Sequence, residues 1–326
     1  MLPGIRTDKQ AVPLVSVIIP AYNNEKFIAA SIQSALDQTW PNKEIIVVDD
    51  GSADNSYEIA HGFGADAVKV YKQANQGPCA ARNNGFGFST GDFIQYLDAD
   101  DLLSPDKIEK QMGLLSLHPD GYVASCAWGR FENKPAEAAF IPQPVWKDML
   151  PADWLISAWS GGGMMQTACW LTPRTLVEAA GPWNESFKQN PNDDGEFFCR
   201  VLLKSKGIRF CEGAKVYYRT HTGQRVSTTT NRQAVQSLLN TCISYEQHIK
   251  LHEVSPRVSD ALTHNYASFL YKYYNTYPEL AAIAEQQIRQ LGVKNIPSTG
   301  GKYFKIGAAL IGLKLMLKLR FIFKKY

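Results

Sequence analysis

The first hundred residues alternate between short apolar runs and segments with helical periodicity. Four runs rich in β-branched and aromatic residues predict buried strands at residues 14–19, 44–48, 67–71 and 93–97. Apolar side chains that recur every three or four positions predict helices at 24–38 (behind an Asn24 cap), 54–62 and 78–88. This alternation indicates βαβ units, and therefore an α/β fold with a mixed, mainly parallel sheet flanked by helices.

The pattern is looser beyond residue 105 and becomes mainly helical beyond residue 230. The further elements predicted before residue 220 are helices at 105–117 and 193–206 and strands at 122–128, 167–171 and 215–219. Residues 154–173 carry no charge over the length of a membrane span. Three consecutive glycines at 161–163 and the proline at 173 argue against a span. We predict instead a glycine-rich loop that enters a buried strand.

Composition and charge narrow the class of protein. With 45% hydrophobic and 20% charged side chains among 326 residues, the chain is globular and long enough for about two domains. Its six cysteines lack the CxxC spacing of a zinc site. The N-terminal arm, residues 1–13, has no apolar core of the kind found in secretory signals. Residues 301–326 contain seven of the 34 basic residues and none of the 31 acidic ones. Residues 1–300 therefore carry more acidic than basic side chains, and we expect no nucleic-acid partner.

The basic tail, residues 301–326, combines its charge with apolar side chains. Leu, Ile, Phe and Met dominate residues 306–323, but Lys314, Lys318 and Arg320 would be costly inside a bilayer-spanning helix. We therefore predict one amphipathic helix that lies in the membrane interface, with its lysines at anionic headgroups. The alternative is a helix packed on the rest of the protein, which explains the apolar face but not the absence of acids.

Polar side chains follow three of the predicted strands. They form three clusters, at residues 20–23, 49–52 and 98–100. Since ligands of parallel sheets bind beyond the carboxyl ends of the strands, we expect these clusters to line one site. Asp98 and Asp100 stand two positions apart on a turning backbone, where they can face one hard cation together with phosphate oxygens and water. The alternative role is a helix cap, which Ser104 can already provide.

The other two clusters and the third helix suit a nucleotide. A glycine permits a tight turn after the second strand, and this leaves Asp49 or Asp50 to accept a hydrogen bond from a base or a ribose hydroxyl. Tyr22 offers a flat ring nearby. Arg82, in the helix that follows the turn at Gly77, could neutralise a diphosphate or form a surface ion pair. The sequence contains no GxxxxGKS/T phosphate loop.

In their order and spacing, these motifs resemble those of the family 2 inverting glycosyltransferases. The matching segments are residues 17–23, 47–54, 77–83 and 97–101. The resemblance is strong over about residues 14–117 and weaker as far as residue 227. It implies the GT-A fold, a Rossmann-like nucleotide-sugar-binding architecture. It also implies a nucleotide-sugar donor, most often a UDP-sugar with GDP and dTDP left open, and Mn²⁺ or Mg²⁺ as cofactor.

The resemblance can be carried over residue by residue to the donor side of the site. The nucleotide-sugar would be bound by residues at the strand ends and in the third helix: Pro20, Ala21, Tyr22, Asn23, Asp49, Asp50, Gly77, Arg82, Asp98 and Ala99. Asp50, with Asp49 as the alternative, would bind the base. Asp98 would reach the ribose or the metal, and Asp100 would bind the metal. His221 lies where the family has a Tyr-Arg-x-His strand end, and would add a metal ligand or a diphosphate contact.

Inversion at an anomeric carbon needs a base on the face opposite the departing diphosphate. The family supplies this base from a Glu-Asp pair that opens a helix, and the Asp-Asp-Gly-Glu sequence here resembles that segment. We expect Asp194 to be the base, with Asp193 and Glu196 as alternatives. Asp193 stands where Glu is common in the family and Gly195 where an aromatic residue is common, so the shape of the acceptor stays open. Gln166 is a candidate acceptor contact.

The chain is therefore expected to have four parts: an arm (1–13), a GT-A catalytic domain (14–229), a helical extension (230–300) and a basic amphipathic tail (301–326). Residues 14–117 would bind the nucleotide-sugar and residues 118–229 the acceptor. The expected enzyme glycosylates a hydroxyl of a carbohydrate or lipid-linked acceptor in cell-envelope, polysaccharide or glycolipid synthesis, at the cytoplasmic, inner face of the membrane. Two alternatives remain: a nucleotidyltransferase, which would open with a Gly-rich basic loop, and a catalytically silent binding module, which would lack the base or metal acids.

Overall fold

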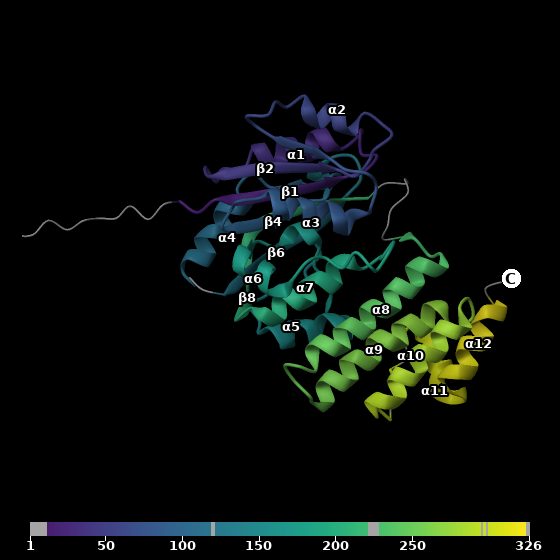
Figure 1. Cartoon of the computed structure of the whole chain (residues 1–326). Helices are drawn as coiled ribbons and strands as arrows, with labels where there is room; N and C mark the ends of the chain where they lie inside the picture. Colours follow the sequence, from purple (N-terminus) through teal and green to yellow (C-terminus); the bar gives the residue numbers. More distant parts are fainter. Residues whose placement is uncertain (1–11, 119–120, 221–227, 295, 298, 324–326) are drawn as a thin grey trace, which may run out of the picture.

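The computed structural model describes residues 12–118, 121–220, 228–294, 296–297 and 299–323. An α/β body that contains both sheets lies beside a group of helices formed by the last third of the chain (Figure 1). The larger sheet has the strand order β3-β2-β1-β4-β7. Its strands are β1 (Val15–Ala21), β2 (Lys43–Asp49), β3 (Lys69–Lys72), β4 (Phe93–Tyr96) and β7 (Thr172–Pro173). All pair in parallel except β7, which runs antiparallel to β4, so the predicted mainly parallel sheet is confirmed.

Three helices connect the parallel strands of this sheet: α1 (Ile28–Leu36), α2 (Ser56–His61) and α3 (Pro78–Phe88). The strands β1 and β2 are buried on both faces, which is why they read as continuous apolar runs. Helix α3 packs directly on β1 and β2. Gly85 allows this close approach, because a Cβ atom at this position would collide with the side chain of Ile18.

The second sheet has the order β5-β8-β6. It consists of β5 (Leu102–Leu103), β8 (Gly207–Arg219) and β6 (Tyr122–Phe131), with β8 antiparallel to β5 and parallel to β6. Helix α4 (Lys107–Ser116) packs on both long strands. The segment between β6 and β8 contains the short helices η1 (Pro135–Glu137), α5 (Pro151–Ser157), η2 (Ala158–Gly162) and η3 (Thr167–Cys169), followed by α6 (Arg174–Ala180) and α7 (Asp193–Lys204).

The last third of the described chain is helical. It contains α8 (Arg232–Ile249), α9 (Pro256–Tyr273), α10 (Pro278–Leu291), α11 (Lys302–Ile311) and α12 (Leu313–Phe323). The side chains of Asn231 and Ser255 cap α8 and α9, and Gly292 ends α10 in the left-handed conformation. Within the described ranges, no helix is both long and apolar enough to cross a bilayer.

Two predicted elements near the site differ from the structure. The strand expected at 167–171 is a 3₁₀ turn, η3, because the side chain of Gln166 accepts a hydrogen bond from the Ala168 amide and so curls the backbone. The helix expected from residue 24 begins only at Ile28 and has no side-chain cap. The Asn24 side chain instead accepts from the Tyr22 amide, so residues 24–27 form a turn before the helix.

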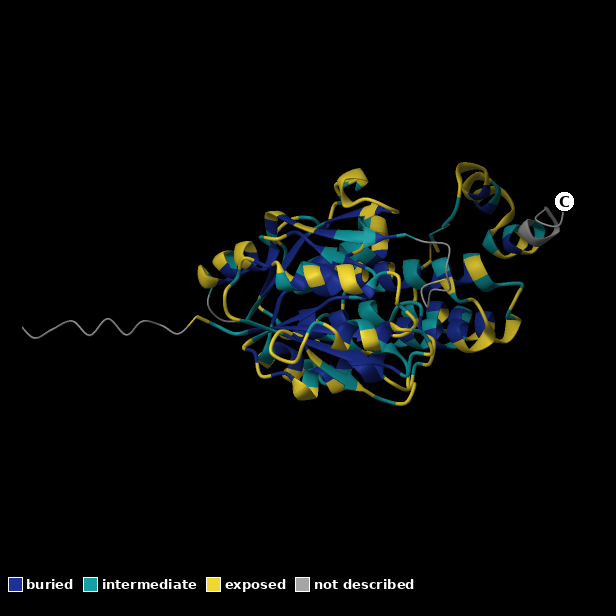
Figure 2. Cartoon of the chain, turned by 90° about the horizontal axis from the view of Figure 1, so that it is seen from above, coloured by how far each residue is buried: buried dark blue, intermediate teal, exposed yellow. Residues whose placement is uncertain are grey.

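The tail is not the single helix that the sequence predicted. Gly312, with φ of 84°, separates α11 from α12. Phe304, Ala308 and Leu317 are buried in the same apolar cluster as α8, α9 and α10. The tail is therefore anchored on the helical extension, and its remaining surface is largely exposed (Figure 2).

Candidate active site

A cleft of about 880 Å³ opens at the carboxyl ends of β1 and β4 and runs past the start of α7 toward α8 and α9. Ten of the residues singled out from the sequence line it: Pro20, Tyr22, Asp50, Arg82, Asp98, Ala99, Asp100, Gln166, Asp193 and Asp194. Gly77 lines an adjoining cavity of about 920 Å³, which shares Tyr22 and Asp193 with the cleft. The topology thus brings most of the predicted residues to one edge of the sheet.

Two other predicted residues, Ala21 and Asn23, lie beside this cleft without lining it. Ala21 is buried at the end of β1, where its carbonyl accepts from the Asp50 amide. Asn23 has φ of 54°, and its side chain accepts a 2.8 Å hydrogen bond from the Ala53 amide. Its own amide donates to Ser52 Oγ at 3.0 Å. Asn23 therefore joins the loops after β1 and β2, while Tyr22 beside it is 50% exposed at the cleft.

The two acids after β2 have different surroundings. The Asp50 carboxylate accepts hydrogen bonds of 2.8 Å from the amides of Gln76 and Gly77, and so it holds the turn that leads into α3. Asp49 is fully buried, and its Oδ2 accepts from the Ser52 amide at 3.2 Å. Of the pair, only Asp50 reaches the cleft.

Arg82 links the donor edge of the sheet to helix α7. Its side chain is only 6% exposed, and its guanidinium donates to Asp98 Oδ1 at 2.9 Å and to Asp193 Oδ2 at 2.8 Å. The same guanidinium lies 4.4 Å from the centre of the Trp183 ring. Burying a cation is favourable only when its charge is compensated, and here two carboxylates and an aromatic face do so.

The acidic loop after β4 is held by Asp101 and Arg219, to which the sequence assigned no role, and by Gln166, which was expected to contact the acceptor. Asp101 is fully buried and accepts from the Arg219 amide at 2.8 Å. The Arg219 side chain donates to the Asp100 carbonyl at 2.9 Å. Gln166 also donates to Asp101, and more weakly to Asp98 Oδ2 at 3.4 Å. The signal for Asp101 was present in the sequence as a third acid beside Asp98 and Asp100.

The residues near this loop suit a hard divalent cation in part. Asp98 and Asp100 both line the cleft, and carboxylate oxygens are the ligands that Mg²⁺ and Mn²⁺ prefer. Among the described residues, however, no group of three His, Cys, Asp or Glu side chains lies close enough to hold a metal. An ion here would need further oxygen ligands from a phosphate or from water. His221 lies outside the described residues.

Asp194, in the first turn of α7, is set apart from its neighbours electrostatically. Its Oδ1 accepts from the Gly195 amide at 2.7 Å, and its Oδ2 accepts from Thr167 Oγ1 at 3.3 Å. Removal from water, followed by the negative charge of Asp193, raises the pKa of Asp194 to about 7. Its carboxylate can therefore take up a proton close to neutral pH.

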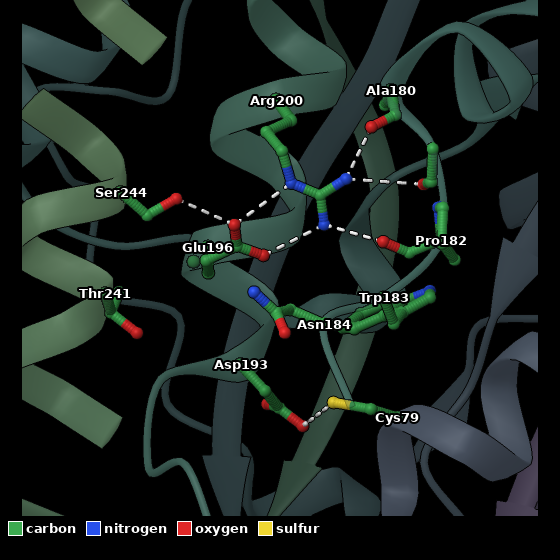
Figure 3. Close-up of polar contacts among 12 residues, drawn as sticks. Cys79, Ala180, Pro182, Trp183, Asn184, Asp193, Glu196, Arg200, Thr241 and Ser244 are labelled. Atoms are coloured by element: carbon green, nitrogen blue, oxygen red, sulfur yellow. Dashed lines mark hydrogen bonds and ion pairs between the residues drawn. The ribbon is translucent and has the colours of Figure 1, made fainter. Parts of the chain in front are cut away.

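Glu196 has a different environment, on the far side of α7 (Figure 3). Its two oxygens accept from Arg200 at 3.0 and 2.9 Å, and Ser244 Oγ donates to it at 2.8 Å. Arg200 also donates to the carbonyls of Ala180 and Pro182. The pair therefore braces α7 against the turn after α6 and against α8. It lines a separate cavity of about 570 Å³ rather than the cleft.

The sequence of this chain is similar to those of known glycosyltransferases. The sequence model of glycosyl transferase family 2 matches residues 16–151. An uncharacterized glycosyltransferase of Rickettsia typhi is 31% identical over 223 residues, which are 68% of each chain. The chain belongs to glycosyltransferase family 2. A second family relative, from Haemophilus influenzae, is 42% identical over 107 residues, or 32% of this chain and 43% of that one.

Solved structures of similar fold agree with this assignment. S. aureus TarS (residues 1–349), crystallised with UDP-GlcNAc, has a TM-score of 0.64 at 17% identity, over 87% of this chain and 81% of its own. The mannosyltransferase PcManGT of Pyrobaculum calidifontis, in complex with GDP-Man and Mn²⁺, has a TM-score of 0.54 at 17% identity, over 94% and 86%. The fold is therefore the GT-A fold, as the resemblance implied.

The ion pairs of Arg82 lead to a first prediction, on stability. Arg82→Met should lower the free energy of unfolding by about 3–5 kcal/mol, because it leaves Asp98 and Asp193 without their cation. Arg257 is a matched control, since it also pairs with two carboxylates but is 54% exposed. Arg257→Met should lower the free energy of unfolding far less than Arg82→Met, because water screens an exposed ion pair. Urea denaturation measures both, and equal losses would contradict the assigned role of Arg82.

Proposed function

We propose that this family 2 enzyme is a metal-dependent, inverting glycosyltransferase. It transfers a sugar from a nucleotide-sugar, foremost a UDP-sugar, to a hydroxyl of a carbohydrate or lipid-linked acceptor. The observation that carries this proposal is the pKa of about 7 at Asp194, in the same cleft as Asp98 and Asp100. Inversion at an anomeric carbon requires a group that can accept a proton near neutral pH. Asp194 is such a group, and it lies in the same cleft as the acid pair at the strand end.

The donor side of the cleft is proposed to bind the nucleotide through Pro20, Tyr22 and Asp50. Tyr22 presents its ring to the cleft, and Asp50 shapes the turn that precedes α3. Two proteins of the same fold were solved with UDP-GlcNAc and GDP-Man respectively, which supports a nucleotide-sugar donor without choosing the nucleotide. Arg82 already pairs with two carboxylates, so we assign it to holding Asp98 and Asp193 in place rather than to direct phosphate binding.

Mn²⁺ or Mg²⁺ is proposed to bind at Asp98 and Asp100. When bound, such an ion would stabilise the negative charge of the departing diphosphate. One oxygen of Asp98 is engaged by Arg82, so the other oxygen, near Gln166, is the one proposed as a ligand. Gln166 then positions the acid loop, because its amide group contacts Asp98, Asp101 and the Ala168 amide.

Asp194 is proposed as the base because its two rivals have other partners. Asp193 pairs with Arg82 at 2.8 Å, so its carboxylate is already engaged by a guanidinium. Glu196 is buried against Arg200 and lies outside the cleft. Within the described residues, Asp194 accepts hydrogen bonds from one amide and one hydroxyl, and its removal from water and the charge of Asp193 raise its pKa.

The second prediction tests donor use and the metal. The wild-type protein should release UDP from UDP-sugars in the presence of Mn²⁺, and Asp100→Asn should lower this rate about 100-fold or more, because the leaving charge loses its counter-ion. Glu178→Gln, which removes an exposed carboxylate from α6, is the control and should behave as wild type. A protein that binds donors but never turns them over would instead favour the silent binding module. Activity that persists in EDTA would exclude the metal.

The third prediction concerns pH. Asp194 must be ionised to act as a base, so transfer should increase about tenfold per pH unit below 7 and level off above it. Asp193→Asn removes the charge that raises the pKa of Asp194, so the midpoint of this profile should move to lower pH. Asp194→Asn should lower transfer by about 10²–10⁴-fold while leaving donor binding intact. Transfer rates of the wild type and the two variants are measured across pH 5–9. A pH profile of Asp193→Asn that matches wild type would count against Asp194 as the base.

The tail is proposed to hold the enzyme as a peripheral protein on the anionic inner face of the membrane. Its apolar side chains divide into two sets, of which Phe304, Ala308 and Leu317 pack on the protein. The other set is exposed on α11 and at the start of α12: Tyr303, Ile306, Leu310, Ile311 and Leu315. Exposed lysines at positions 302 and 305 adjoin this second set, and anionic headgroups complement their charge.

The fourth prediction tests this surface with vesicles. Ile306→Ser combined with Leu310→Ser should abolish most co-sedimentation with vesicles that contain anionic lipid, because the exposed apolar face is lost. Leu251→Ser with Val254→Ser is the matched control, since these side chains are 82% and 81% exposed but lie far from the tail in sequence. Equal pelleting of the two double variants, or equal binding to neutral vesicles, would rule out the tail as an electrostatic anchor.

A further inference from the structure

A buried tryptophan, Trp183, contacts three elements that meet at the cleft: β4, α3 and α7. It lies in the segment between α6 and α7 and is only 1% exposed. Its ring stacks on Phe197 of α7, with centroids 4.0 Å apart and 9° between the ring planes. The ring of Tyr96 in β4 is nearly perpendicular to it, with centroids 5.1 Å apart. The guanidinium of Arg82, in α3, lies 4.4 Å from its centre.

The residues around this ring are close in the chain to the acids of the cleft. Tyr96 precedes Asp98 by two residues, and Phe197 follows Asp194 by three, which places it on the same side of α7 one turn later. Because an aromatic ring has two opposite faces, Phe197 covers one face of the tryptophan and Arg82 lies over the other. The tryptophan therefore fixes the arginine relative to both acidic segments.

The main chain at Trp183 is held from α3 and from α7. The Asn83 side chain of α3 accepts a 2.8 Å hydrogen bond from the Trp183 amide and donates one of 3.0 Å to the Trp183 carbonyl. Arg200 of α7 donates to the carbonyl of the preceding residue, Pro182, at 2.8 Å (Figure 3). The ring is thus held in place by hydrogen bonds of its own backbone as well as by packing.

The hydrogen bonds of Arg82 leave one part of its guanidinium without an oxygen partner. Nη1 donates to Asp193 and Nη2 to Asp98, but the buried Nε atom has no hydrogen-bond partner within the described residues. A buried N–H without a partner is unfavourable, and the negative face of an aromatic ring attracts the cation that carries it. The ring of Trp183 therefore supplies a contact to Arg82 that no described oxygen supplies.

We propose that Trp183 is a positioning residue of the cleft, and that its ring, held through Asn83, keeps the guanidinium of Arg82 between the two acidic segments. Without the ring, the guanidinium could turn away from Asp193, whose charge would then be less compensated. Trp183 does not line the cleft itself, so it acts through the arginine. Where it concerns catalysis, this inference rests on the proposed function, because it takes Asp194 as the base.

The effect of the tryptophan on catalysis is expected at Asp194. This carboxyl group faces Asp193 on its own helix, Arg82 of α3, Asp98 of the loop after β4 and Tyr245 of α8. Burial and the two other carboxylates raise the pKa of Asp194, whereas the cation lowers it. Displacement of the guanidinium would therefore raise this pKa further. The base would then stay protonated up to a higher pH, and transfer would be lost first on the acidic side of the profile.

Two substitutions at Trp183 separate its aromatic face from its bulk. Trp183→Phe keeps a face toward Arg82, whereas Trp183→Leu fills part of the space without one. The measured quantity is the rate of transfer at pH 6 divided by the rate at pH 8.5, which does not depend on the amount of folded enzyme. This ratio should fall about threefold or more in Trp183→Leu and stay near the wild-type value in Trp183→Phe. If Trp183→Leu does not fold, Asn83→Ala replaces it, because it removes the backbone contacts and keeps the ring.

Phe86, also in α3, provides a matched control. Arg174 lies 4.7 Å from the centre of its ring, but within the described residues this arginine donates to the Gly91 carbonyl and the Ser89 hydroxyl rather than to a carboxylate. Phe86→Leu therefore removes an aromatic–arginine contact from the same helix without affecting the acids of the cleft. Its ratio of rates should equal that of the wild type.

The contact between Trp183 and Arg82 can also be observed without any activity. In full-length protein with isotope-labelled arginine, the Nε–H nuclear magnetic resonance signal of Arg82 is the one absent from Arg82→Lys. The ring current of an aromatic side chain shifts a proton over its face upfield. Trp183→Leu should therefore move this signal downfield, and Phe86→Leu should leave it in place.

The two measurements together decide the role of Trp183. The inference is overturned if the Arg82 signal does not move in Trp183→Leu, or if the ratio of rates in Trp183→Leu equals that of the wild type and of Phe86→Leu. An equal fall of the ratio in Trp183→Phe and Trp183→Leu would also overturn it, because the aromatic face would then be irrelevant. A wild type that transfers no sugar at any pH would count against the proposed function, and the arginine signal would still test the contact.

Discussion

The site depends on one buried cation between two acidic segments. Asp98 lies in the loop that follows β4 of the larger sheet, and Asp193 opens helix α7 almost one hundred residues later. Two carboxylates this close would repel each other if nothing lay between them. The guanidinium of Arg82 bridges them, and its planar fork reaches both at hydrogen-bond distance. The strand-end loop and helix α7 therefore have fixed positions relative to each other.

This bridge also separates the chemical properties of two adjacent acids. Asp193 forms an ion pair with Arg82. Asp194 next to it is withdrawn from water and forms no ion pair among the described residues. Removal from water, and then the charge of Asp193, raise the pKa of Asp194 to about 7. Carboxyl groups whose environment raises the pKa in this way are common where acid–base chemistry occurs. Asp194 is withdrawn from water, whereas Asp193 faces the arginine.

The sequence predicts the parallel sheet and the strand-end residues because both depend on local pattern. Apolar runs mark β1, β2 and β4, and the acids at positions 98 and 100 follow shortly after β4 in the chain. The sequence does not reveal which residues distant along the chain pair with each other. Nothing local indicates that Asn23 bonds to the next loop, that Asp101 receives the Arg219 amide, or that Ser244 donates to Glu196. Whether an acid is a ligand, a base or a brace depends on such partners.

Two of the three element predictions that differ from the structure, the strand at 167–171 and the single tail helix, have the same origin. The apolar run at 167–171 reads as a strand, but the Gln166 side chain bonds to the backbone and forms a turn instead. The apolar positions of the tail read as one amphipathic helix, but Gly312 ends the first half and allows the second to fold back onto α10. In both cases a single residue with its own backbone preference outweighs the periodicity.

Helix α7 is held from two sides. Arg82 holds its first turn toward the sheet, while Glu196 and Arg200 fix its next turn to α8 and to the carbonyls after α6. Asp194 therefore keeps its position relative to the helical extension as well as to the strand ends. Side chains of α8 and α9 line the cleft too, so substitutions there would change the surroundings of Asp194 without removing a strand-end acid. Under the proposed function, acceptor choice and donor chemistry would then be separable, with α7 as the element that couples them.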